Sequence, residues 1–202
     1  MPGNPKRQLI WIPIIHTQVD LGSLSEAVGR LYIQKIGRGK WKRHHLAVEA
    51  RWGIIEQLID QLNLDYKKVR LYQDGLPHCG QEEKIVRELA QAGSRNHQIL
   101  LRLMAKGAQI TGTESPQLLL EEYELARQVL AALDSPLSKR LSAQQKEFSQ
   151  ALLEKRDRFI ARRIDESLRA GETGLVFLGM LHSLEGRLPP DIQLMRLEPA
   201  HA

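Results

Sequence analysis

An apolar run near the carboxyl end constrains the fold of this chain more than any other segment. Within residues 173–186, TGLVFLGMLHSLEG, residues 175–178 are continuously apolar and Met180 follows after one glycine. Such a run predicts a strand buried on both faces, as in a parallel sheet covered by helices. His182 comes at the end of this strand. The carboxyl ends of strands in an α/β sheet are where ligands and catalytic groups usually gather.

Four other segments have the β-branched or apolar character of strands. Residues 9–15, LIWIPII, contain Pro13, which lacks an N–H donor and therefore predicts an edge position or a bulge. The remaining three are shorter, at residues 68–72, 108–111 and 192–197.

Helical periodicity fills the regions between the strands. Helices are expected from Ser23 or Ser25 to Ile36, over 42–62, over 81–106 with a break near 93–94, over 117–133, and over 142–169. Gly37 and Gly39 are expected to separate the first two helices, and Asp134, Ser135 and Pro136 to close the fourth. The alternation predicts an α/β fold with a mostly parallel sheet of four to five strands, flanked by long helices. We expect one domain over residues 1–202, with residues 1–8 as a polar leader.

Four of the predicted strands are followed by residues able to carry chemistry. These are His16, Asp74, Glu114 and His182. Right-handed crossovers would bring the ends of parallel strands to one side of the sheet. Two imidazoles and two carboxylates there could hold a divalent metal, or act as general base and acid. Each residue also has an ordinary structural explanation: Asp74 precedes a glycine as in a turn, and Glu114 precedes a helix start.

Composition restricts the class of protein. The 202 residues are 42% hydrophobic and 26% charged, with a net charge of +5, which is typical of a folded chain rather than a disordered one. No apolar stretch approaches the roughly 18 residues that a membrane span requires, and no signal-peptide pattern opens the chain. The lone Cys79 agrees with a reducing compartment. We therefore expect a cytoplasmic protein with no membrane association.

The carboxyl-terminal segment resembles a known signature. In residues 154–186 an Arg156-Asp157 pair opens a helical stretch that leads into the apolar strand, which ends in Gly179-Met-Leu-His182. This is similar to the Arg-Asn or Arg-Asp pair and Gly-x-x-His of the superfamily that contains the TraB and Tiki proteins, the erythromycin esterases and the ChaN-type haem-binding lipoproteins. His16 and Glu114 resemble that family's amino-terminal histidine and acidic strand end.

The resemblance implies a hydrolase-like site with histidines and acids, which depends on a divalent metal in the Tiki branch and not in the erythromycin esterases. It does not choose a substrate, and we expect a small molecule or a peptide. On this hypothesis His16, Glu114 and His182 hold the metal or activate water. Asp74 would orient one imidazole, and Arg156 would stabilise developing negative charge.

Two alternatives come from other segments. Residues 35–45, KIGRGKWKRHH, form a basic cluster. Lys40, Trp41, Lys42 and Arg43 could bind a phosphorylated ligand or a nucleic acid in a non-catalytic module. Charge runs usually face water without binding anything, so a solvated surface explains the same residues. Alternatively, the long helices over 42–62 and 142–169 would serve contacts in a homo-oligomer.

Overall fold

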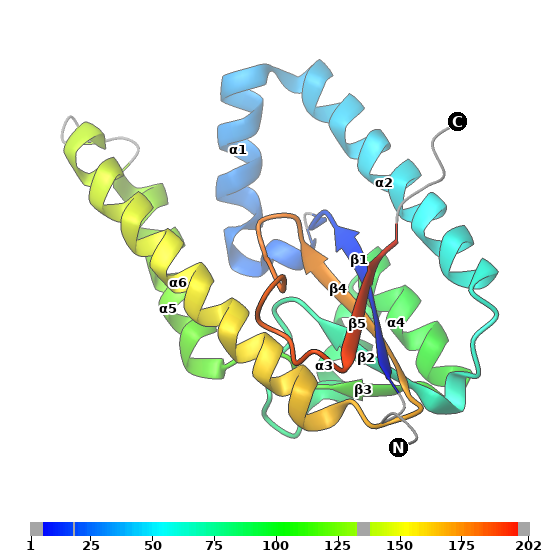
Figure 1. The fold of residues 1–202 in the computed structure, drawn as a ribbon. Coiled ribbons are helices and arrows are strands. Elements are labelled where there is room, and N and C mark those ends of the chain that lie inside the picture. Colours follow the sequence, from blue (N-terminus) through cyan, green and yellow to red (C-terminus); the bar gives the residue numbers. More distant parts are fainter. Residues whose placement is uncertain (1–5, 18, 133–137, 198–202) are drawn as a thin grey trace.

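A five-stranded sheet forms the centre of the protein (Figure 1). This computed structural model describes residues 6–17, 19–132 and 138–197. All strand pairs are parallel, and the strand order is β3-β2-β4-β1-β5. The strands are β1 (Arg7–Ile14), β2 (Val69–Gln73), β3 (Gln109–Thr111), β4 (Thr173–Gly179) and β5 (Ile192–Arg196). The predicted α/β class with a parallel sheet of four to five strands is confirmed.

Within the described ranges, six α-helices and two short 3₁₀ segments connect the strands. The helices are α1 (Ser25–Ile36), α2 (Arg38–Gln61), α3 (Glu82–Gln91), α4 (Arg95–Ala105), α5 (Pro116–Ala132) and α6 (Ser138–Ser167); the 3₁₀ segments are η1 (Val19–Leu24) and η2 (Tyr66–Lys68). The expected closure of α5 at Asp134, Ser135 and Pro136 lies outside the described residues. In the described part of the chain, no helix combines the length and the apolar character needed to cross a bilayer.

The start of α2 differs from the sequence prediction. Gly37 separates α1 from α2 with a φ of 82°, a conformation that glycine adopts without steric cost. Gly39, expected to be a second break, lies instead inside α2, which begins four residues earlier than predicted. The prediction was wrong here because a single glycine in a helix costs only about 1 kcal/mol, which the rest of a long helix outweighs.

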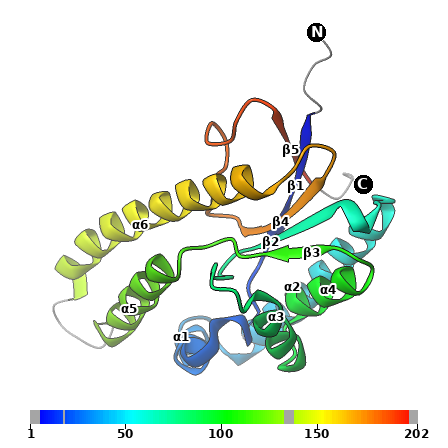
Figure 2. The ribbon, with the colours of Figure 1, turned by 90° about the horizontal axis from the view of Figure 1, so that it is seen from below.

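Helices cover both faces of the sheet (Figure 2). On one face, α2, α3 and α4 contribute Trp52, Ile59, Val86 and Leu100 to a core that includes strand residues such as Phe177. On the other face, Ile160 and Ile164 of α6, and Leu168 directly after it, pack onto the sheet beside Val176 and Leu178. Burial of β4 on both sides explains the unbroken apolar run from which the strand was predicted.

Pro13 does not lie on an edge strand, contrary to the prediction. β1 lies between β4 and β5, so it is an interior strand. Its ladder with β5 ends at Trp11, whose carbonyl accepts from the N–H of Leu197 at 2.8 Å. Pro13 is two residues further on, so its backbone nitrogen points towards the same neighbouring strand as that of Trp11. At Pro13, however, β5 has already ended. The missing N–H therefore removes no ladder hydrogen bond.

The first residues of β1 belonged to the predicted polar leader. Arg7 starts the strand and its guanidinium hydrogen-bonds Asp191 and Asp165 at distances of 2.7 to 3.1 Å. These contacts fix the amino-terminal end of β1 against β5 and α6. The sheet therefore begins two residues before the predicted start of the strand at residue 9.

Parallel pairing brings the carboxyl ends of β1, β2, β3 and β4 to one edge of the sheet. The segments that follow β2 and β3 remain side by side. Pro77 and Glu114 form an isolated parallel bridge, and His78 N–H donates to the Glu114 carbonyl at 2.8 Å. Ser115 then accepts from Leu118 N–H at the start of α5. Glu114 is thus held immediately before a helix, at the edge where the other strand ends meet.

Candidate functional site

The carboxylate of Asp74, directly after β2, is the centre of the candidate site. Its Oδ2 lies 3.2 Å from His16 Nε2 and 3.4 Å from His182 Nε2. The same oxygen accepts the N–H of Gly179 at 2.9 Å. Its Oδ1 accepts from Arg156 Nη2 at 2.8 Å. One buried carboxylate therefore contacts His16 after β1, His182 after β4 and Arg156 of α6.

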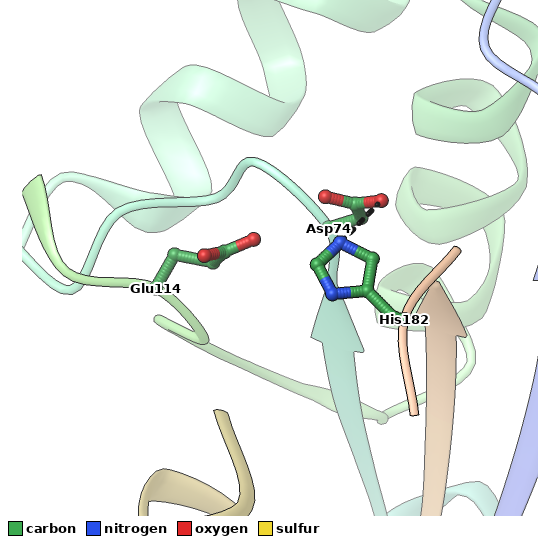
Figure 3. Close-up of side chains that lie close together, drawn as sticks. All are labelled: Asp74, Glu114 and His182. Atoms are coloured by element: carbon green, nitrogen blue, oxygen red, sulfur yellow. Dashed lines mark ion pairs between the residues drawn. The ribbon is translucent and has the colours of Figure 1, made fainter. Parts of the chain in front are cut away.

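Arg156, on α6, holds three carboxylates around its guanidinium. Its Nε donates to Glu114 Oε2 at 2.9 Å and its Nη2 to Glu114 Oε1 at 2.5 Å, a bidentate pair. Nη2 also donates to Asp74, and Nη1 donates to Glu122 of α5. Figure 3 shows the Glu114 side chain extending towards Asp74 and His182. Arg156 thereby links the residues after β2 and β3 to α5 and α6.

His182 is held between two carboxylates. Its Nδ1 lies 2.6 Å from Asp157 Oδ1, and its Nε2 faces Asp74. The other oxygen of Asp157 accepts the N–H of Ser183 at 3.0 Å. The imidazole is buried, with a side chain 4% exposed. Because both nitrogens face acceptors, this ring is arranged as a doubly donating imidazolium.

His16 occupies a different environment on the same carboxylate. Its side chain is 40% exposed, and among the described residues only its Nε2 has a carboxylate partner. The residues that follow are fixed by Asp20, which accepts from Thr17 N–H at 2.6 Å and from Thr17 Oγ1 at 2.8 Å. Asp20 also accepts from Ser94 Oγ at the start of α4. His16 is therefore an accessible group on an anchored segment.

Gly179 allows β4 to approach Asp74 closely. A Cβ at this position would lie 3.0 Å from Asp74 Oδ2 and 3.8 Å from both His16 Nε2 and His182 Cδ2. The glycine of the Gly-x-x-His segment therefore leaves room for the hydrogen bond from its own N–H to Asp74.

The two buried acids of the site have opposite pKa shifts. For Asp74, burial alone would raise the pKa, but the hydrogen bonds from His16 and His182 hold it well below the ordinary value. For Glu114, burial raises the pKa, and the ion pair with Arg156 only partly opposes this. Asp74 is thus the firmly ionised carboxylate, while Glu114 is the one that protonates first on acidification.

Both histidines have raised pKa values. Burial of His182 opposes its charge, but the hydrogen bonds to Asp157 and Asp74 outweigh that effect and raise its pKa to about 9. For His16, desolvation also opposes the charge, and the hydrogen bond to Asp74 produces a net rise. Near neutral pH, His182 is therefore an imidazolium.

The raised pKa of His182 predicts a loss of stability at alkaline pH. A histidine whose folded pKa exceeds its unfolded value of 6.5 stabilises the fold fully below that value, and the contribution disappears as pH rises through about 9. We expect the free energy of unfolding, measured with urea, to fall across this window. His182→Gln should remove this part of the decline, whereas His44→Gln, on the exposed surface of α2, should retain it. Equal pH profiles for the wild type and His182→Gln would contradict the assignment.

A metal fits the arrangement of these side chains poorly. Asp74, Glu114 and His182 each offer a ligand atom, and these atoms lie within 4.8 Å of one another. His16, predicted to be a ligand together with Glu114 and His182, is outside this group. Arg156 already contacts both carboxylates, and its positive charge would repel a cation placed between them. In this arrangement, basic side chains rather than a divalent cation lie against the two carboxylates.

Comparisons with known proteins do not assign this chain to a family. No family model matches the sequence, and no curated protein or solved structure matches it either. The arguments about the site therefore come from its own geometry.

The structure brings together all five residues predicted for the hydrolase site: His16, Asp74, Glu114, Arg156 and His182. Two further members were not predicted as site residues. Asp157 stands beside Arg156 in the Arg-Asp pair, which was the available signal for its contact with His182. Glu122 lies on α5, and only its contact with Arg156 marks it, because acidic residues are frequent on helix surfaces.

The basic segment lies apart from this site. Figure 1 shows the start of α2 at the outer end of α1, away from the sheet. Lys40, Lys42 and Arg43 are exposed and form no ion pair with the described residues. Trp41 packs against three neighbouring rings, those of Tyr32, His44 and His45, at centroid distances of 5.2, 6.0 and 5.7 Å. This packing leaves the indole less available for stacking on a base than the sequence suggested.

Proposed function

We propose that the protein is a hydrolase in which His16 acts as the general base. The observation that carries this proposal is the contrast between the two histidines on Asp74. His182 has both nitrogens occupied and is buried, whereas His16 is 40% exposed and has one nitrogen without a carboxylate partner. An accessible imidazole oriented by a buried carboxylate is the arrangement that general-base catalysis requires.

Asp74 would fix the proton of His16 on one nitrogen. A firmly ionised carboxylate can only accept, so Nε2–H of His16 donates to Asp74 Oδ2. In the neutral ring the lone pair is then on Nδ1. We propose that Nδ1 takes a proton from a water molecule as the water oxygen attacks the substrate's carbonyl carbon, and that Asp74 stabilises the resulting imidazolium. The imidazolium then returns this proton to the leaving alcohol or amine as the ester or amide bond breaks, which restores the neutral base.

Arg156 and His182 would provide the positive charge near the reacting group. Of the five N–H donors of Arg156, four bind carboxylates, and one on Nη1 has no hydrogen-bond partner among the described residues. This donor is our candidate for stabilising an oxyanion. His182, an imidazolium with both nitrogens engaged, would add charge without transferring a proton.

The proposal is metal-independent, unlike the sequence hypothesis of a divalent cation. The reason is the occupation of Asp74 and Glu114 by Arg156. The resemblance to the superfamily of the TraB proteins and erythromycin esterases supports the hydrolase class and leaves the substrate, a small molecule or a peptide, open. Cys79, which is exposed and forms no disulfide, agrees with action in the cytoplasm.

A hydrolysis panel tests this proposal. We expect the purified protein to hydrolyse at least one class in a panel of chromogenic esters and amides. The rate should rise with pH through the raised pKa of His16, because the base must be neutral. Dialysis against EDTA and readdition of Zn²⁺ or Mn²⁺ should leave the rate unchanged.

Two outcomes would count against the proposal. Loss of activity in EDTA with recovery on metal addition would reject metal independence. No hydrolysis of any panel member, together with retention on nucleic acid that weakens with salt and requires Lys40, Lys42 and Arg43, would favour the binding-module alternative instead.

A further inference from the structure

A cavity of about 530 Å³ lies between α1 and the α5–α6 pair. The ribbon views place α1 alongside α5 in this region (Figures 1 and 2). The volume falls within the roughly 300–1,000 Å³ typical of small-molecule sites. Its lining combines six apolar residues with four polar ones: Leu24, Val28, Leu125, Ala126, Val129 and Leu130 with Glu122, Gln145, Lys146 and Ser149.

One side chain belongs to both the cavity and the charged site. Glu122 lines the cavity, and its carboxylate accepts from Arg156 Nη1. Ser23 Oγ and Tyr123 Oη, 3.1 Å apart, join the segment that follows His16 to α5 beside Glu122. Glu122 therefore belongs both to the wall of the apolar cavity and to the charged cluster around Arg156.

We propose that this cavity binds the apolar part of the substrate, so that the substrate is an amphiphilic ester or amide with a hydrocarbon group. The inference rests on the proposed hydrolase function, since it places the acyl group beside His16 and Arg156. The hydrocarbon chain lies between α1 and α5, and the polar reacting group remains at the edge of the sheet.

The chemistry of the lining favours a hydrocarbon over a polyanion. Only Glu122 and Lys146 carry charge there, and Glu122 is already paired with Arg156. The rim of the charged site adds two apolar side chains, because Met180 and Leu181, next to His182, are 57% and 83% exposed. A ligand with a polar group and an apolar chain can hydrogen-bond the charged site and pack against the apolar lining at the same time.

Binding of a chain-length series tests the inference without catalysis. The probes are linear methyl ketones of increasing length, which contain a carbonyl and no hydrolysable bond, measured by isothermal titration calorimetry. We expect the dissociation constant to fall about fourfold for each added methylene until the cavity is filled. Ala126→Trp, which fills the cavity, should abolish this dependence. Ala131→Trp, at an exposed position on α5 outside the lining, should retain it.

The controls separate this inference from the proposed function. His16→Gln should bind the ketones like the wild type. If both bind them while the wild-type protein hydrolyses no ester or amide, the hydrolase proposal fails and the cavity assignment stands. Hydrolysis without chain-length dependence in the wild type would overturn the cavity assignment alone, even if Ala126→Trp does not fold. Sedimentation that shows a dimer dissociated by Ala126→Trp would also overturn it, because the cavity would then be an interface between copies of the chain.

Discussion

Replacing Arg156 by methionine should lower the free energy of unfolding by about 3 to 5 kcal/mol, as expected when a buried ion pair loses one partner. The guanidinium is 5% exposed, and it contacts Asp74 and Glu114, whose side chains are 5% and 0% exposed. Removing it leaves two desolvated carboxylates without their shared cation. Urea unfolding near pH 7 measures the loss.

The loss should be smaller in mild acid. Burial already raises the pKa of Glu114, and without Arg156 that pKa should rise further, so protonation relieves part of the cost. Arg156→Lys should be intermediate, because an ammonium keeps the charge but cannot form the bidentate contact. Arg158→Met is the matched control on the same helix, since Arg158 is 67% exposed and pairs with Glu154, itself 49% exposed. We expect its effect to stay within about 0.5 kcal/mol. An Arg156→Met variant as stable as this control would contradict the central role of the cluster.

His16→Gln should reduce kcat/KM by about 10²- to 10⁴-fold, the usual contribution of a general base. The amide of glutamine can still hydrogen-bond Asp74 but cannot take up a proton from water near neutral pH. Because His16 is 40% exposed, the free energy of unfolding should change much less than activity does. Steady-state kinetics and urea unfolding of the same preparation separate the two effects.

The pH profile identifies the base more specifically. Asp74 raises the pKa of His16, so Asp74→Asn should move the inflection of kcat/KM towards lower pH as well as lowering the rate. His78→Gln is the control, since the imidazole of His78 is exposed and contacts Glu82, and the substitution leaves the backbone hydrogen bond to Glu114 in place. A His16→Gln enzyme with wild-type turnover on every hydrolysed substrate would remove His16 from the mechanism.

The fold was predictable because its strands carry strong local signals. The run at 175–178 is apolar throughout because β4 is buried on both faces, and alternation with helices then implied parallel pairing. Finer details depend on pairing that the sequence does not specify. Pro13 is compatible with an interior strand only because β5 is short, and Gly39 remains helical because the rest of α2 stabilises it.

The candidate site was predictable to the extent that strand ends determine it. Asp74 follows β2 directly and Glu114 lies three residues beyond the end of β3, so parallel topology brings them to one edge. Glu122 and Asp157 come from helices, and their contacts depend on how α5 and α6 are rotated and placed against the sheet. The sequence also did not predict that His16 is accessible whereas His182 is buried between two carboxylates. This difference arises from burial and from the position of Asp157 rather than from residue type.

The position of β1 has a consequence for how the chain folds during translation. Trp11 Nε1 donates to the carbonyl of Leu178, 167 positions later, and both neighbours of β1 come from the last part of the described chain. The apolar strand at the amino-terminal end therefore emerges from the ribosome well before either partner strand exists. Long-range pairing of this kind slows folding and leaves apolar segments exposed meanwhile. We expect the nascent chain to associate with chaperones until β4 has been synthesised.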